Sequence, residues 1–210
     1  MVMGFCFSAV ILLAMYKEIT LDYINESVMY LPLFAMLLTT MVNLEIYEYR
    51  IEEIYYVANV KKLKTFIFNV SKIILIEATV IVFNYLMYGV LFDIGFEHSI
   101  EKRLYFEAVF IAMLYITSIT TFMCVLLKRK SSVLCVISLI WIYWMVNATQ
   151  VSSSNPFIFV AIPSEYESFI IGQILISLLL LLGAFLLESK GPFWIKDTIS
   201  RVGNKIYRRI

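Results

Sequence analysis

Long apolar runs separated by short charged segments restrict the fold of this chain more than any other feature of its sequence. Six such runs occur, at about residues 2–16, 29–44, 73–92, 104–127, 133–148 and 169–187. Because a helix rises about 1.5 Å per residue, a run of about 20 apolar residues matches the hydrocarbon thickness of a bilayer. Hydrophobic residues make up 61% of the 210 residues, which is more than a soluble domain of this size can bury. We therefore expect an all-α integral membrane protein in which residues 1–210 form a single domain of six transmembrane helices.

The basic residues predict how these helices are oriented. Of the 17 Lys and Arg residues, fourteen lie in three segments, residues 45–72, 128–130 and 188–210. The other three, Lys17, Lys102 and Arg103, fall in the alternate loops. Because basic residues concentrate on the cytoplasmic side of a membrane, this partition places the three segments and both termini in the cytoplasm. The sequence thus predicts a multi-pass protein of the cell membrane.

The segment 45–72, between the second and third runs, has an amphipathic pattern. Apolar residues recur there at helical spacing, while Glu48, Glu52 and Glu53 fall on the opposite side. The pattern predicts a short helix lying flat on the cytoplasmic membrane surface, followed by a basic turn and a return into lipid. Such a helix could simply rest on the headgroups, or it could receive a push from a soluble partner. The pattern alone leaves both interpretations open.

The tail, residues 188–210, carries a second amphipathic pattern. After Gly191 and Pro192, apolar residues recur every three or four positions, and basic residues fall on the other side of the expected helix. A helix of this kind would lie in the inner leaflet, held by anionic lipid. We interpret it as an anchor that fixes the orientation of the chain.

Four residues within the apolar runs are candidates for a transport pathway: Glu77, Glu107, Trp141 and Trp144. A carboxylate inside a span could relay protons or act as counter-charge for a cationic substrate. Both Glu77 and Glu107 fall about one turn inside their expected spans, so we favour side chains that snorkel to the interface or cap a helix start. The two tryptophans could line a pathway for an amphiphile or serve as packing and interface residues.

Other polar residues in the runs indicate packing rather than chemistry. Asn43, Asn84 and Asn147 are expected to join helices through side-chain hydrogen bonds. The cysteines are odd in number and all lie in apolar runs, so neither disulfides nor a metal cluster is predicted. Residues 2–16 lack the basic region and the cleavage site of a signal peptide, and we interpret them as a retained span.

Several functions are argued against by the sequence. The single histidine, His98, lies in a loop, which leaves no multi-histidine metal site. The sequence contains neither a G-x-x-x-x-G-K-[ST] phosphate loop nor a G-x-S-x-G nucleophile elbow. Topology accounts for the basic residues, so nucleic-acid binding is not expected. We therefore predict no catalytic, cofactor or metal site in the chain itself.

This pattern resembles the ABC-2-type permeases, which are the membrane subunits of ABC exporters. The resemblance covers the topology of nearly the whole chain, and its motifs lie in residues 45–72. Glu48-Tyr49-Arg50, the helix 51–59, Lys61-Lys62 and Ser71-Lys72 resemble the acidic start, amphipathic helix, basic pair and small-residue–Lys pair of the family. The loop with Asn155-Pro156 and Ile162-Pro163 resembles its external hairpin. The family's early glycine, its proline before the basic residue and its helix before span one are absent here.

The resemblance implies a coupling helix that docks on a separate ATPase subunit. It carries this role over to eight residues: Glu48, Arg50, Glu52, Glu53, Tyr56, Asn59, Lys61 and Lys62. ATP and Mg²⁺ would bind to the ATPase, and a second permease chain, identical or different, would complete a dimer in the membrane lipid. The expected substrate is amphiphilic: a peptide, an antibiotic or a lipid.

Two alternatives from other classes stay open at this point. The first is a non-transporting membrane protein, such as an immunity or sensor subunit, which needs no ATPase. The second, less favoured, is a membrane-embedded enzyme that uses Glu77 or Glu107 as a base.

Overall fold

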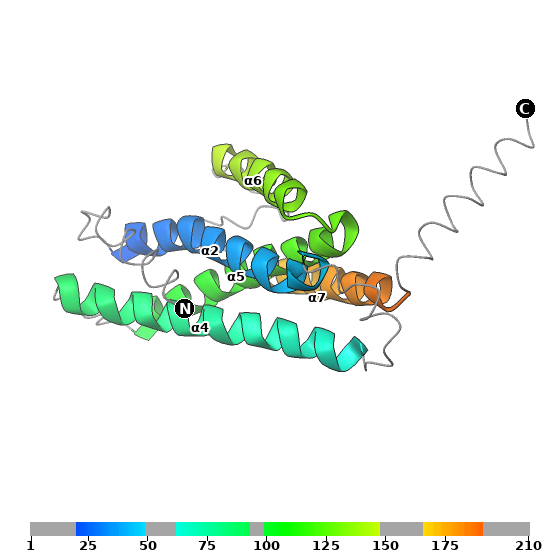
Figure 1. Cartoon of the computed structure of the whole chain (residues 1–210). Coiled ribbons are helices and arrows are strands. Elements are labelled where there is room, and N and C mark those ends of the chain that lie inside the picture. The colour runs from blue at the N-terminus through cyan, green and yellow to red at the C-terminus, as the bar shows by residue number, and fades with distance from the viewer. Residues whose placement is uncertain (1–19, 49–61, 93–98, 148–165, 191–210) are drawn as a thin grey trace, which may run out of the picture.

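The computed structural model describes residues 20–48, 62–92, 99–147 and 166–190 (Figure 1). These residues form five helices, and the part of the chain described contains no strand. The helices are α2 (Thr20–Glu48), α4 (Lys62–Phe92), α5 (Ser99–Leu127), α6 (Lys130–Val146) and α7 (Tyr166–Lys190). The predicted all-α class is therefore confirmed for the described residues.

Helix α5 forms the centre of the bundle. Its membrane-length stretch has 72% of its residues buried inside the protein, against 22% for α4 and 17% for α7. It packs most extensively on α2 and α7, and it also contacts α4 and α6. The buried residues of α4 form one stripe at helical spacing, which faces this centre. Most of the surface of α4 and α7 is left apolar and exposed, as suits a surface that faces lipid.

Four helices are long and apolar enough to cross a membrane: α2, α4, α5 and α7. They correspond to the predicted spans 29–44, 73–92, 104–127 and 169–187. The predicted span 133–148 corresponds to α6, whose 17 residues fall short of the about 20 that a crossing needs. The predicted span 2–16 and the tail beyond residue 190 lie outside the described residues. The described helices are thus those of a membrane protein, while six spans and cytoplasmic termini remain predictions.

The helices begin earlier than hydropathy predicts. Residues 20–27 belong to α2, although we expected a polar loop over residues 17–27, and α4 starts at Lys62 rather than near Ile73. Hydropathy marks only the part of a helix that matches lipid, whereas backbone hydrogen bonds continue into polar sequence. The residues 62–72 that were expected to form a basic turn and a return into lipid are therefore the first three turns of α4.

Cross-helix contacts fix the direction of the helices. Thr39 and Asn43 of α2 bond to Thr117 and Thr121 of α5, so these two helices run parallel. Contacts between α4 and the same two helices run in the opposite order, so α4 is antiparallel to them. Phe66, near the start of α4, packs on Phe185, near the end of α7, at 5.6 Å between ring centroids. The ends of α2, α5 and α7 and the start of α4 thus lie at one end of the bundle (Figure 1).

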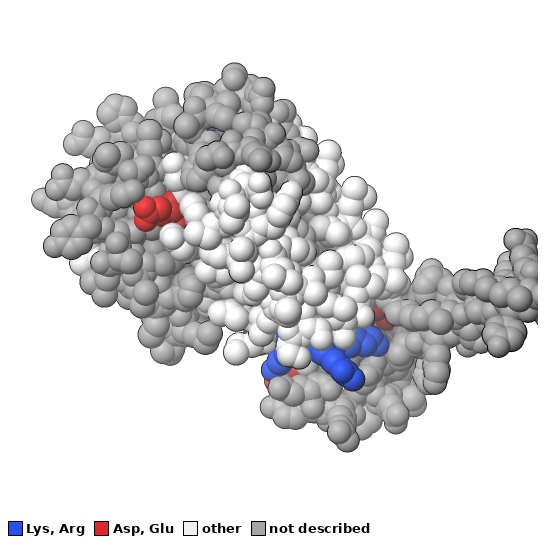
Figure 2. All heavy atoms as spheres, turned by 90° about the horizontal axis from the view of Figure 1, so that it is seen from above, with Lys and Arg blue, Asp and Glu red and all other residues white. Residues whose placement is uncertain are grey.

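This shared end is also the basic end. It includes Lys62 and Lys64 of α4 and the Lys128–Lys130 turn. Figure 2 shows Lys and Arg side chains gathered in one region of the visible face, with some acidic atoms beside them. A wide uncharged area separates this region from an acidic patch toward the opposite end. The charge rule assigns residues 45–72, 128–130 and 188–210 to one side of the membrane. The described parts of these three segments lie at the same end of the bundle.

A tight turn connects α5 to α6. Lys128 has φ 53°, a left-handed conformation that commonly ends a helix, and its N–H donates to the Cys124 carbonyl at 3.0 Å. Arg129 is extended and α6 begins at the next residue. The reversal directs α6 back along α2 and α5.

Candidate functional site

Most buried polar side chains of α2, α4 and α5 lie at two levels of the bundle. The inner level, nearer the basic end, contains the buried residues Glu77, Thr39, Thr117 and Thr121 and the half-buried Asn43. A carboxyl group within a membrane-spanning core is by default a candidate for function, so this level is the candidate site.

Glu77 lies at the centre of the inner level. Its side chain is 1% exposed, and the Thr117 hydroxyl donates to its Oε1 at 2.5 Å. The Thr39 hydroxyl lies 3.4 Å from that of Thr117, so α2, α4 and α5 meet at this point. Because α4 starts at Lys62, Glu77 lies about 22 Å along the helix from its first residue. The expectation that Glu77 snorkels or caps a helix start is wrong, because the helix begins three turns before the predicted span.

The surroundings of Glu77 limit what it can do. Within the described residues, it forms no ion pair with a Lys, Arg or His. Burying a carboxylate without a neighbouring cation costs free energy. Glu77 is therefore suited to take up a proton or to bind a cationic partner. The Thr117 hydroxyl of α5, which lies next to the Thr39 hydroxyl of α2, holds the side chain in place. The geometry is therefore that of a fixed intramembrane acceptor.

Asn43 adds a second cross-helix bond one turn from Thr39. Its Nδ2 donates to the Thr121 hydroxyl at 3.1 Å. Thr120, a buried neighbour on α5, has a hydroxyl with no hydrogen-bond partner. The inner level thus has polar side chains on more than one side of α5.

The outer level is a cluster of tyrosines around Asn84. Asn84 Nδ2 lies 2.9 Å from the Tyr23 hydroxyl and 3.1 Å from that of Tyr105, with the Ser27 hydroxyl at 3.4 Å. The rings of Tyr23 and Tyr88 stack with centroids 3.7 Å apart. The prediction that Asn43 and Asn84 join helices is confirmed by these contacts. Asn147, which caps the end of α6, donates to the Tyr143 carbonyl of that helix.

Sequence reasoning missed the tyrosines of this cluster. Residues 17–27 were expected to form a polar loop, whereas Tyr23 and Ser27 belong to α2 and are buried. Asn84, a lone amide in an apolar run, was the one available signal that partners must exist.

An apolar layer separates the two levels. From Tyr105 to Thr117, α5 advances about 18 Å, and the buried residues between them are nearly all apolar. On α2 the layer is formed by Leu31, Phe34 and Ala35. On α2 and α5 this layer lies between the outer and inner polar groups.

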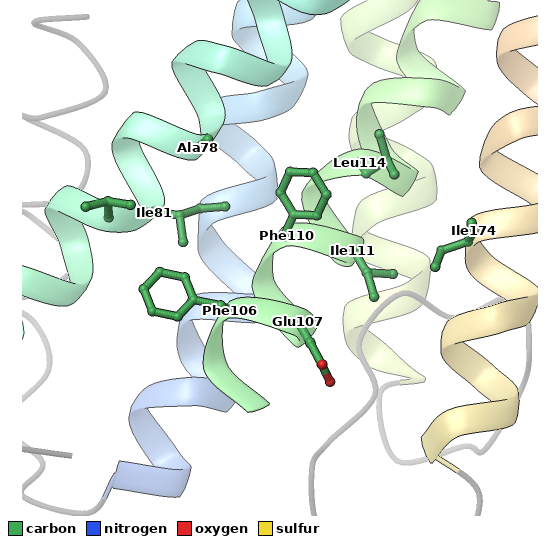
Figure 3. Close-up of a pocket in the computed structure, with 9 residues that line it drawn as sticks. Ala78, Ile81, Phe106, Glu107, Phe110, Ile111, Leu114 and Ile174 are labelled. Carbon is green, nitrogen blue, oxygen red and sulfur yellow. The ribbon is translucent and has the colours of Figure 1, made fainter. Parts of the chain in front are cut away.

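Glu107 lies apart from Glu77, at the edge of a lateral groove. Its Oε1 accepts from Arg103 Nε at 2.5 Å, an ion pair one turn apart on α5. Helix α5 begins at Ser99, so Glu107 caps no helix start and pairs within its own helix. The groove, with a volume of about 620 Å³, is lined by Ala78, Ile81, Val82, Phe106, Glu107, Phe110, Ile111, Leu114 and Ile174 (Figure 3).

The two candidate tryptophans pack α6 on its neighbours. Trp141 Nε1 donates to the Met29 carbonyl at 3.2 Å, close to Pro32, which interrupts the hydrogen bonds of α2. Trp144 is buried, and its ring lies 5.8 Å from that of Tyr115. The four candidate pathway residues thus lie in three places: Glu77 in the core, Glu107 in the lateral groove, and both tryptophans at α6.

Most of the candidate coupling residues lie outside the described part of the chain. Glu48 is the last residue of α2 and Lys62 the first of α4. Those that fall between the two helices, in residues 49–61, are Arg50, Glu52, Glu53, Tyr56, Asn59 and Lys61. The two helix ends that flank this segment lie at the basic end of the bundle.

Among the described residues, no group of three His, Cys, Asp or Glu side chains could hold a metal ion. No protein-family model, curated protein or solved structure matches this chain.

Proposed function

We propose that this chain is the permease subunit of an ATP-driven exporter of the ABC-2 type, which moves an amphiphilic substrate out of the cell. Residues 48–62 would be the coupling element, and ATP and Mg²⁺ would bind to a separate ATPase subunit. A second permease chain would complete the pathway.

The observation that supports this proposal is the position of the two helix ends that flank residues 49–61. The end of α2 and the start of α4 lie beside the end of α5, where the basic Lys128–Lys130 turn begins. By the charge rule this is the cytoplasmic side, where an ATPase would bind. A force on residues 49–61 would therefore act directly on α2 and α4, the two helices that hold the inner polar level with α5.

The mechanism follows from these parts. Closure of two ATPases on ATP would push the coupling segments and tilt α2 and α4 relative to α5. The apolar layer between the polar levels would be the barrier that opens during this motion. Glu77 would meet the polar or cationic part of the substrate as it passes the inner level.

The test is co-purification of the tagged chain from detergent-solubilised native membranes. We expect an ATPase subunit and vanadate-sensitive ATP hydrolysis in the preparation. The double variant Glu52→Lys/Glu53→Lys should lose both, because it reverses the charge of two residues in the segment proposed to dock. The matched control is Glu97→Lys/Glu101→Lys, an equal reversal in the segment that the charge rule places outside.

Correct insertion of each variant would be checked before the comparison. Absence of an ATPase, under conditions in which a known exporter keeps its own, would contradict the proposal. That result would favour the non-transporting alternative, an immunity or sensor protein.

A further inference from the structure

The groove between α4, α5 and α7 has the shape of a site for a hydrocarbon chain. Its floor is formed by Ile81 and Ile111, which are 2% and 7% exposed. Its walls include Phe106 and Phe110 of α5 and Ile174 of α7 (Figure 3). Val82 on the α4 rim is 46% exposed, so the groove opens to the side of the bundle. In a membrane this side faces lipid, and acyl chains would fill the groove.

The charged end of the groove is distinct from the rest. Among the described residues that line it, Glu107 is the one that carries a charge, and its carboxylate points away from Phe110 (Figure 3). Arg103 lies one turn nearer the helix start, and the side chains of Arg103 and Glu107 are 76% and 37% exposed. By the charge rule this end of α5 faces the outer surface, so the pair lies where headgroups are.

We propose that this groove binds a membrane phospholipid whose headgroup carries both a phosphate and a primary amine. An acyl chain would occupy the apolar groove, the phosphate would bind Arg103, and the amine would bind Glu107. The proposal depends on membrane insertion of the bundle and not on export.

Charge complementarity favours this headgroup over others. Among the described residues, Glu107 bonds only to Arg103, through Oε1, which leaves Oε2 available to a donor. A purely anionic headgroup would place negative charge beside Glu107, and a purely cationic one would place positive charge beside Arg103. A headgroup with both charges can satisfy the pair, and charge-assisted hydrogen bonds of this kind are among the stronger ones.

A second groove provides an internal comparison. It has a similar volume, about 620 Å³, and is lined by Ser71, Ile74, Leu75, Ala78, Thr79 and Val82. None of the described residues that line it is charged, so lipid chains there should be held without selection of the headgroup.

The test is native mass spectrometry of the purified full chain in detergent, supplied with equal amounts of phosphatidylethanolamine and phosphatidylglycerol of identical acyl chains. We expect the wild type to retain phosphatidylethanolamine in about tenfold preference, the effect of one charge-assisted bond. Glu107→Gln, which keeps the size of the side chain, should bring the ratio close to one.

A pair of identical substitutions locates the site. Ile174→Trp fills the groove and should lower phosphatidylethanolamine retention about tenfold, while Ile74→Trp, in the second groove, should leave it unchanged. Equal retention of the two lipids by the wild type would overturn the proposal, as would an unchanged ratio in Glu107→Gln. If Ile174→Trp does not fold, as judged by size-exclusion chromatography, the Glu107→Gln ratio decides alone.

Discussion

Glu77 and Thr117 form a buried hydrogen bond that joins α4 to α5. Thr117→Val removes the hydroxyl that donates to Glu77, so the carboxyl group should stay buried but lose this hydrogen bond. We expect a loss of about 1 kcal/mol in the free energy of unfolding, near the upper part of the range for interhelical bonds in membranes. Thermal unfolding in detergent measures it.

Thr120 provides the matched control for that substitution. It is equally buried on α5, but its hydroxyl has no hydrogen-bond partner. Thr120→Val should therefore be neutral or slightly stabilising. Equal losses in the two variants would show that the Thr117–Glu77 bond does not contribute to stability.

Replacing Glu77 itself separates its structural role from its proposed role in transport. Glu77→Gln keeps an oxygen that can accept from Thr117, so folding and ATPase binding should persist. Export should fall, because the amide cannot carry the charge or the proton that the substrate would meet. The readouts are co-purification of the ATPase and accumulation of the substrate in cells. Normal export would remove Glu77 from the mechanism.

At the scale of helices, the contact between α5 and α7 depends on a small residue. A Cβ at Gly183 would lie 3.3 Å from Cε2 of Phe122, whereas a Cβ at Gly172 of the same helix would meet nothing within 4 Å. Gly183→Leu should therefore cost about 1–3 kcal/mol, the usual range for overpacking. Gly172→Leu should be neutral or stabilising, because leucine is the better helix former. A similar melting temperature for the two variants would contradict this packing.

The sequence predicted the existence of the helices better than their ends. Four apolar runs correspond to α2, α4, α5 and α7, because uncharged stretches of this length have few other stable forms in a membrane. We predicted that the third span begins near residue 73, which placed Glu77 at the membrane interface. Because α4 begins at Lys62, Glu77 lies in the core instead. Hydropathy cannot detect such an extension, since Lys62 and Lys64 are as compatible with a helix end as with a loop.

The candidate site was predicted only in part. Asn43 and Asn84 were recognised as joining residues because an amide in lipid must find a partner. Their actual partners, among them Thr121 and Tyr105, depend on which helices are neighbours, which one sequence does not specify. Trp141 illustrates the same limit, because its bond to the Met29 carbonyl joins residues 112 positions apart.

At the scale of the whole molecule, the charge rule predicts which end of the bundle is cytoplasmic. Starting from a chain without its three native cysteines, single cysteines would be introduced at Lys64, near the start of α4, and Lys102, near the start of α5; both positions are exposed. A membrane-impermeant thiol reagent added to intact cells should label Lys102→Cys and not Lys64→Cys. Labelling should reverse in inside-out vesicles. Labelling of Lys64→Cys in intact cells would invert the proposed topology.

The proposed function depends on contact between the coupling segment and an ATPase, and a photo-crosslink tests that contact most directly. A photoreactive phenylalanine derivative would replace Tyr56 in the coupling segment and, as a control, Tyr166 at the start of α7, the end opposite the basic one. After irradiation of intact cells, the account predicts a crosslinked ATPase subunit from position 56 and none from position 166. A chain inserted in the membrane that gives no ATPase crosslink at position 56 would contradict it.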